Sequence, residues 1–177
     1  IDNSNDIPQL TNVTISKNSN NSFSSRAITL YSRGAGIYLE HNTIGLSLRN
    51  VTITENSNIS NSLGSSAEAR GSGIYGNNSH INILNSTITN NSNSAVSSSS
   101  SSSSRGGIHT TDTVTIGSSI VAFNTGGTNI YGILNTNGYN IFSNSPFGFT
   151  STDQTFVGTS ALNLDTLKFN GGTTKTL

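Results

Sequence analysis

One segment pattern recurs along the chain and constrains the fold more than any other feature. The clearest copies begin with an arginine, a glycine-rich turn and an isoleucine, continue through short alternating runs, and close on an asparagine. The closing residues are Asn18, Asn56, Asn91, Asn124 and, less clearly, Asn144. They are separated by 38, 35, 33 and 20 residues. Periods of this length indicate a solenoid, in which each copy packs against the next.

Inside each copy the apolar residues alternate with the period of two that is typical of a β-strand. Examples of the three runs in a copy are Ile37 and Leu39, Leu46 and Leu48, and Val51 and Ile53. The last copy is aligned with Tyr139 and Ile141 pointing inward. Because no window shows the helical period, the sequence predicts an all-β fold, a parallel β-helix with three sheets and about five coils. The general chirality of parallel crossovers predicts a right-handed coil.

Polar insertions account for the different intervals and fall at one corner of the predicted solenoid. They occupy residues 18–32, 56–69 and 91–104. We expect long polar loops there, with one short extra strand at residues 27–31. The run Ser97 to Ser104 has no side chain that could enter a core, so it is expected to be a mobile loop.

The whole chain, residues 1–177, is expected to form a single β-helix domain. Residues 1–10 are a candidate N-terminal extension or donor strand. Residues 11–144 contain the repeated coils. Residues 145–177 are rich in phenylalanine and are expected to form a looser coil or cap over the end of the core.

Composition limits the partners of this protein. Charged residues make up 9% of the chain, eight basic and eight acidic, so neither nucleic acid nor an anionic membrane surface is an expected partner. No apolar run is long enough to span a membrane. Cysteine is absent, which excludes disulfides and thiolate metal sites. The start at Ile1 resembles a processed or truncated end, and we expect an extracellular or cell-surface location.

Two repeated sets of residues are interpreted as structural. The asparagines Asn18, Asn56, Asn91 and Asn124 are expected to stack as an internal amide ladder at a bend. The corner glycines are expected to provide positive φ angles or close backbone approach, because a phosphate-binding loop would open a helix instead. These glycines are Gly34, Gly36, Gly71, Gly73, Gly106 and Gly107.

Two further columns have alternative interpretations. Arg33, Arg70 and Arg105 share one register, and such a row could hold carboxylates or acidic sugars bidentately. The alternative is a solvated column neutralised by Glu40, Glu55 and Glu68. A second column of outward threonines, such as Thr52 and Thr54, resembles the array of ice-binding solenoids, but it is interpreted as ordinary β propensity.

No catalytic constellation is expected. Glycan hydrolysis and metal-assisted elimination need two or more carboxylates on one face. The aspartates fall in different copies and registers, and the histidines do not align with one another; they are Asp2, Asp6, Asp112, Asp153, Asp165, His41, His80 and His109. We therefore expect no enzymatic activity, no cofactor and no metal site, and calcium has no dedicated set of ligands in the sequence.

The Gly-x-Gly-Ile-Tyr pattern, with residues 119–127 and 138–141, resembles right-handed parallel β-helix repeat proteins of microbial cell surfaces. Residues 149–153 and 170–177 resemble the tail of the choice-of-anchor Q group and of polymorphic outer-membrane-protein-like repeats. Thr173 stands where that group usually has proline, and its tail usually continues past the position of Leu177. The resemblance implies a secreted or surface-displayed protein used for adhesion, coats or fibres.

The expected function is that of a non-catalytic extracellular structural or adhesive β-solenoid. Copies could associate end to end into a fibre, by coil stacking or by donation of the strand Ile1 to Leu10, or the chain could belong to a larger surface protein. The candidate assembly ends are Ile1, Ile7, Leu10, Phe169 and Leu177. The alternative function is a carbohydrate-active or carbohydrate-binding β-helix, similar to polysaccharide lyases, with a glycan beside the arginine column.

Overall fold

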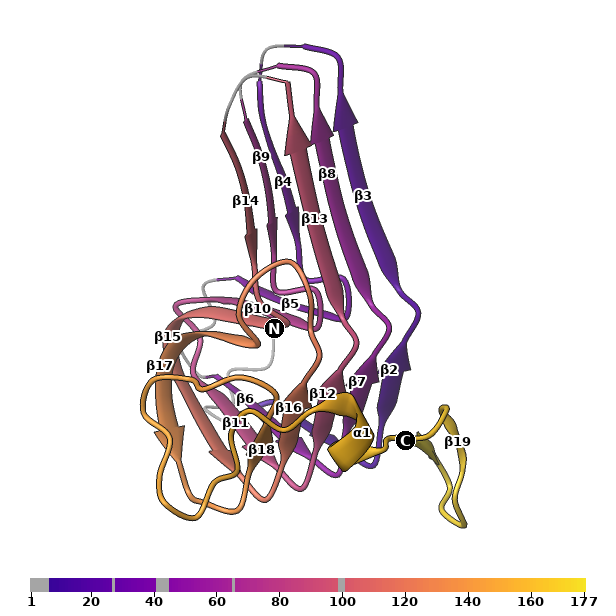
Figure 1. Ribbon diagram of the computed structural model, residues 1–177. Helices are drawn as coiled ribbons and strands as arrows, with labels where there is room; N and C mark the ends of the chain where they lie inside the picture. The colour runs from indigo at the N-terminus through magenta and orange to yellow at the C-terminus, as the bar shows by residue number, and fades with distance from the viewer. Residues whose placement is uncertain (1–6, 27, 41–44, 65, 99–100) are drawn as a thin grey trace.

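The computed structural model describes residues 7–26, 28–40, 45–64, 66–98 and 101–177. It is an all-β solenoid of stacked parallel strands from which a flat arm projects (Figure 1). The predicted fold class, a parallel β-helix, is confirmed. Among the described residues the one helix is a single turn, α1 (Thr159–Leu162). That segment contains none of the repeated pattern.

Three rows of parallel strands form the body, and successive coils add a strand, or part of a longer strand, to these rows. The first row contains β1 (Gln9–Thr11), β6 (Leu46–Arg49) and β11 (Ile81–Leu84), followed by the later parts of β15 (Ile108–Gly117) and β17 (Ile130–Thr136). The second row contains β2 (Thr14–Ser16), β7 (Thr52–Thr54), β12 (Thr87–Thr89), β16 (Ile120–Ala122) and β18 (Ile141–Phe142). The third row contains β5 (Ile37–Glu40), β10 (Ile74–Asn77) and the first residues of β15 and β17.

Equivalent apolar residues of successive coils lie directly above one another in the core. Ile37, Ile74, Ile108 and Ile130 are paired in register along the third row. Ile53, Ile88, Val121 and Phe142 are paired in the same way along the second row. Burial of these stacked side chains is the main stabilising contribution available to coils that could not fold singly.

The predicted asparagine ladder is present inside the body. Each side-chain amide donates to the amide oxygen of the next member, at 2.9 Å from Asn18 to Asn56, from Asn56 to Asn91, and from Asn91 to Asn124. The fifth member is Asn129, which accepts from Asn124 at 3.0 Å and in turn donates to Asn144 at 2.8 Å. Asn144 is therefore the acceptor beyond the ladder and not its fifth rung.

The predicted alignment of the last coil is wrong by one residue. Ile120 pairs with Ile141, and Val121 pairs with Phe142. Phe142 fills the core, whereas Tyr139 is 72% exposed because it occupies a left-handed bend with φ of 61°. A run of two apolar residues gives no sequence signal that distinguishes these two registers.

Left-handed residues make the sharp corners of the coils. At the corner after the arm, Gly34, Gly71 and Gly106 have φ values of 62°, 58° and 50°. A Cβ atom on Gly71 would lie 2.2 Å from the carbonyl oxygen of Ile74, so this position excludes any side chain. The partner glycine Gly73 has no positive φ, but its Cβ would lie 3.0 Å from the carbonyl oxygen of Gly107. Both predicted roles of the corner glycines are thus observed.

The polar insertions do fall at one corner, but they form strands instead of loops. One sheet of the arm contains β3 (Ser19–Ser24), β8 (Ser57–Ser62) and β13 (Ser92–Ser97). The facing sheet contains β4 (Thr29–Arg33), β9 (Ser66–Arg70) and β14 (Ser101–Arg105). In the serine run expected to be mobile, Ser97 belongs to β13 and residues 101–104 belong to β14, while residues 99–100 lie outside the described residues. The extra strand predicted at residues 27–31 corresponds to β4, which begins at Thr29 and ends two residues later than predicted; residue 27 lies outside the described residues.

Small side chains let the two sheets of the arm approach closely. Ser60, Ala67 and Ala69 are fully buried between them. At the base, a second set of asparagines joins the sheets, because the Asn58 amide donates to the carbonyl of Arg70 at 2.8 Å. Asn20 and Asn93 make the equivalent bonds to Arg33 and Arg105, at 3.1 and 3.3 Å. These bonds fix the backbone of the arginine column.

The C-terminal region covers less of the core than expected. Gln154 forms a bridge with Ile141, and its N–H donates to the carbonyl of Asn140, so residues around it extend the last coil. The chain then passes in front of the second row and forms a hairpin of β19 (Lys168–Phe169) and β20 (Lys175–Thr176) (Figure 1). There the Thr14 hydroxyl donates to the carbonyl of Lys175 at 2.6 Å. The hairpin therefore returns to the first coil.

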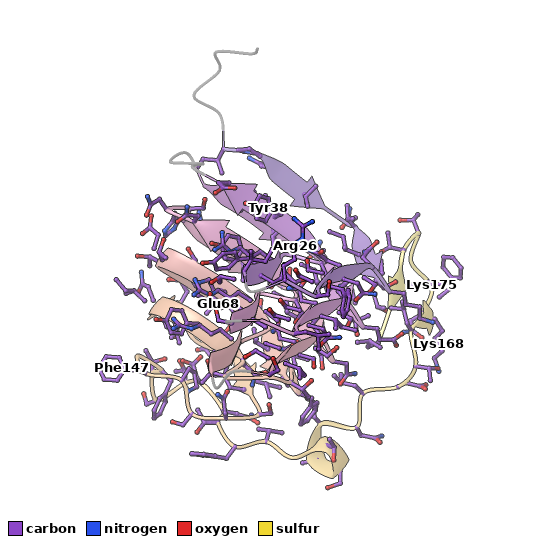
Figure 2. All side chains as sticks on the ribbon, turned by 90° about the horizontal axis from the view of Figure 1, so that it is seen from above. Arg26, Tyr38, Glu68, Phe147, Lys168 and Lys175 are labelled. Atoms are coloured by element: carbon purple, nitrogen blue, oxygen red, sulfur yellow. The ribbon has the colours of Figure 1, made fainter. Side chains whose placement is uncertain are left out.

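Two surfaces predicted from the sequence, the threonine array and the phenylalanine-rich cap, are not formed as expected. The outward residues Thr52, Thr54 and Thr89 are buried, so they do not form the open, flat threonine array that ice binding requires. The phenylalanines at 147, 149, 156 and 169 are exposed and do not form a packed cap. Figure 2 shows Phe147 pointing away from the body.

Candidate functional site

A cluster of arginine and aromatic side chains in mutual contact lies where the arm meets the body. The outer face of β4, β9 and β14 carries the arginine column there, and the adjoining outer face of the third row carries aromatic rings. We call this cluster the arginine–aromatic corner, and its members are Tyr31, Arg33, Tyr38, Glu68, Arg70, Tyr75, Arg105, His109 and Tyr131.

Four rings stack in a continuous column, because each follows the core isoleucine of its own coil. Tyr38 and Tyr75 have centroids 5.3 Å apart, and Tyr75 and His109 are also 5.3 Å apart. His109 and Tyr131 are 4.6 Å apart, and all three pairs are nearly parallel. The middle rings are buried, whereas Tyr38 and Tyr131 keep 46% and 42% of their surface exposed. The column therefore offers an accessible ring at each end.

The arginines lie against these rings. The Arg33 guanidinium is 4.3 Å from the ring centroid of Tyr31 and 5.3 Å from that of Tyr75. The Arg105 guanidinium is 4.5 Å from the centroid of Tyr131. Such cation–π contacts hold the planar guanidinium groups in fixed orientations and contribute about 0.5–1 kcal/mol each at exposed sites.

The expected neutralisation of the arginine column is only partly observed. Glu68 forms an ion pair with Arg70. Glu55 pairs instead with Lys17 at 3.5 Å, and Glu40 accepts a hydrogen bond from the Tyr38 hydroxyl. This bond and partial burial raise the pKa of Tyr38. Within the described part of the chain, neither Arg33 nor Arg105 has a carboxylate at ion-pair distance.

His109 is buried at the centre of the ring column. Burial, followed by the positive charges of Arg70, Arg105 and Arg33, lowers its pKa to about 4. Neither ring nitrogen has a hydrogen-bond partner among the described residues. The histidine is therefore a neutral ring in the stack at ordinary pH, and it is not placed as a general base or a metal ligand.

A groove of about 580 Å³ lies beside Tyr131, at the end of the ring column. Its floor and walls come from Thr128, from residues 130–134 of β17 and from the segment 144–147 that follows β18. Thr111 and Thr128 add hydroxyl groups, while Ile133 and Phe147 add exposed apolar surface. Thr110 also lines the groove, but it is fully buried and its hydroxyl donates to the carbonyl of Ser79. A partly apolar hollow with a few polar groups is typical of small-ligand and sugar sites.

The predicted carboxylates are not brought together. Asp153 accepts hydrogen bonds from the N–H groups of Asn140 and Thr150 and from the Thr136 hydroxyl. Burial raises its pKa, but these bonds outweigh that effect and hold the pKa below the usual value. In the described residues no three His, Asp or Glu side chains gather as metal ligands would. Asp2, Asp6 and His41 lie outside the described residues.

Two of the candidate assembly ends are placed differently from the expectation. Leu10 belongs to β1, which pairs with β6 of the same chain, so it is packed against its own core. Phe169 lies in the hairpin beside the first coil, whereas the prediction placed it at the opposite end. Ile7 is exposed, Leu177 is partly buried, and Ile1 lies outside the described residues. None of the helices in the described regions has the length and apolarity of a membrane span.

The class of this protein is assigned from its architecture. The asparagine ladder, the second set of asparagines at the base of the arm, the ring column and the arm all follow from one repeated pattern, and they identify a parallel β-solenoid. No family model matches the chain, and no curated protein or solved structure gives a significant match to it.

Proposed function

We propose that this chain is a non-catalytic extracellular adhesive module in which a rigid β-solenoid displays a projecting arm. The observation that supports this proposal is the apolar tip of the arm. Phe23, Ile28, Leu63 and Val96 lie at or near the outer ends of the arm strands, and each is between 48% and 69% exposed. We call these four residues the arm tip.

An exposed apolar group at the end of a polar arm is best explained as a contact surface. The interior of the arm is polar and small, so its own folding does not require Phe23 or Leu63. Clustered exposed apolar residues mark surfaces that bind other molecules. The neutral, Asn- and Ser-rich composition and the resemblance to microbial surface β-helix proteins support an extracellular setting.

The experiment compares adhesion before and after the arm tip is made polar. Beads coated with the protein should adhere to an alkyl-coated surface under flow, and changing all four tip residues to serine should reduce adhesion roughly fivefold or more. The control is Phe147→Ser, which removes a fully exposed phenylalanine from the body (99% exposed). Equal loss in both variants would mean that adhesion follows general hydrophobicity, and the arm-tip proposal would then be abandoned.

Assembly into a head-to-tail fibre is a finer proposal for the same role. Only the first three coils carry arm strands, because the fourth coil passes directly from Asn124 to Asn129. Stacked bodies would therefore display separate arms at regular intervals along the filament. We expect negative-stain electron microscopy of concentrated protein to show such filaments with and without calcium. A uniformly monomeric sample would contradict fibre formation and favour a module of a larger surface protein.

A further inference from the structure

We propose that the arginine–aromatic corner and the groove beside Tyr131 bind an acidic polysaccharide, a chain of sugars that carries carboxylate or sulfate groups. The site lies at the base of the arm and does not include the arm tip. The inference therefore does not depend on the adhesive role of the tip. It concerns binding, and no bond in the sugar chain is broken.

The first argument is the unused hydrogen-bonding capacity of the arginines. Arg33 and Arg105 have no ion-pair partner among the described residues, and only Arg70 is paired, with Glu68. The Nε atoms of Arg33 and Arg70 are buried without a hydrogen-bond partner in the described structure. A guanidinium has five donors in a planar fork that matches carboxylate and sulfate oxygens. The column therefore keeps positive charge at Arg33 and Arg105 that no described carboxylate neutralises, and a ligand would meet the terminal nitrogens of the fork instead of the buried Nε atoms.

The second argument is the preorganisation of the column. The backbone carbonyls of Arg33, Arg70 and Arg105 accept hydrogen bonds from the asparagines at the base of the arm. The guanidinium groups of Arg33 and Arg105 also rest on aromatic rings. Side chains that are already ordered lose less conformational entropy when a ligand binds. Strand spacing places the outer two arginines roughly 10 Å apart, which suits a ligand with repeated acidic groups.

The third argument is the chemistry of the groove. Tyr131 lines it, and the Arg105 guanidinium lies 4.5 Å from the centroid of that ring. A sugar ring has an apolar face and polar edges, so an exposed aromatic ring with nearby hydroxyl groups can accommodate it. Thr111 and Thr128 supply hydroxyl oxygens, which donate to Asn78 and to the carbonyl of Ile130 within the chain. One acidic sugar in this groove would place its acid next to Arg105, and the chain would continue towards Arg70 and Arg33.

The low charge of the molecule favours a polysaccharide over nucleic acid. Proteins that bind nucleic acid neutralise many phosphates with clustered basic residues. Here the whole chain has eight basic and eight acidic residues, and the corner contains three of the arginines together with Glu68. A few fixed guanidinium groups beside aromatic rings match a ligand of moderate charge density.

The test measures the affinity of the full chain for hyaluronan, dextran sulfate and neutral dextran by affinity electrophoresis, at about 0.15 M salt. Wild type should bind at least one acidic polymer and not dextran. Relative affinity for the two acidic polymers distinguishes carboxylate from sulfate recognition. The Arg33→Gln/Arg105→Gln double variant leaves the Arg70–Glu68 pair intact, and it should weaken binding roughly tenfold or more. Tyr131→Ser should weaken binding severalfold without a change in charge.

The matched control is Arg26→Gln/Arg49→Gln, which removes two exposed arginines outside the corner and changes the net charge equally. We expect its binding to remain within about twofold of wild type. The four-serine arm-tip variant should also bind normally, which separates this site from the adhesive proposal. The inference is overturned by no wild-type binding to either acidic polymer, by equal weakening in the control, or by equally tight binding to a single-stranded oligonucleotide. Circular dichroism of every variant confirms that it is folded.

Discussion

Replacing Asn91 by alanine is expected to lower the free energy of unfolding by about 4 kcal/mol, one of the largest effects available to a single substitution in this chain. The Asn91 side chain donates to the Ile53 carbonyl at 3.0 Å and to Asn124, and it accepts from both the backbone and the side chain of Asn56. These hydrogen bonds lie inside the body, where Asn91 and Asn56 are fully buried. Alanine leaves the backbone N–H of Asn56 buried without its acceptor and removes the acceptor of the Asn56 side-chain amide.

The matched comparison is Asn18→Ala, at the first rung of the same ladder. Asn18 is exposed and donates to Asn56, but no further rung of the ladder donates to it. Its replacement should therefore cost about 1 kcal/mol. Urea unfolding of both variants measures the difference, provided that the m-values agree. Equal losses for the two variants would mean that the ladder does not act through buried hydrogen bonds.

Acid is expected to destabilise the protein through His109. The pKa of this histidine is about 4 in the folded state, against about 6.5 in an unfolded chain. Between these values the unfolded state binds a proton that the folded state does not, so stability falls as the pH decreases from 6.5 towards 4. The contribution is constant above about pH 7, and about 2 kcal/mol should be lost by pH 5.

The His109→Tyr variant isolates this effect. Tyrosine continues the ring column between Tyr75 and Tyr131 and does not titrate in this range. Unfolding free energies at pH 7.5 and pH 5.0 should therefore differ by about 2 kcal/mol more in wild type than in the variant. Most carboxylates remain ionised at pH 5, so they contribute little to the comparison. The same pH dependence in both proteins would exclude His109 as its source.

The body of the fold could be predicted because its pattern is set by burial. Ile53 and Ile88 recur with the same neighbours and must face the same core, so the register between coils follows from their alignment. Asn56 and Asn91 recur at the adjoining bend, where a buried amide needs another amide as its partner. Both inferences rest on requirements that every coil must meet.

Apart from β4, the arm was not predicted as strands, because its other segments have weak β propensity and no apolar alternation. The signal that does exist is an alternation of small residues, seen in Ser60 and Ser62, which pair in register with Ala95 and Ser97 of the next coil. Repetition between coils gives each strand a ready partner, and the backbone ladder then compensates for low propensity. Small inward side chains allow the second sheet to pack against the first.

The ring column was not predicted from the sequence, because the positions of the histidines in the repeat were compared only with one another and not with those of the tyrosines. His109 follows Ile108 just as Tyr75 follows Ile74, so its equivalents in other coils are tyrosines. Aligning residues by position in the coil instead of by type would have shown the stack. Its contact with the arginine column depends on the angle between arm and body, which the repeat pattern does not specify.

The fourth coil shows that the arm is an optional addition to the solenoid. There Asn124 donates directly to Asn129, and Gly126 and Gly127 turn the chain in the space where other coils begin an arm. The Asn91–Asn124 rung before this shortcut and the pairing of Ile108 with Ile130 after it continue the columns of the body. The arm of a coil could therefore be lengthened, shortened or removed in evolution by equal changes in its outgoing and returning strands. The body beneath it would remain the same.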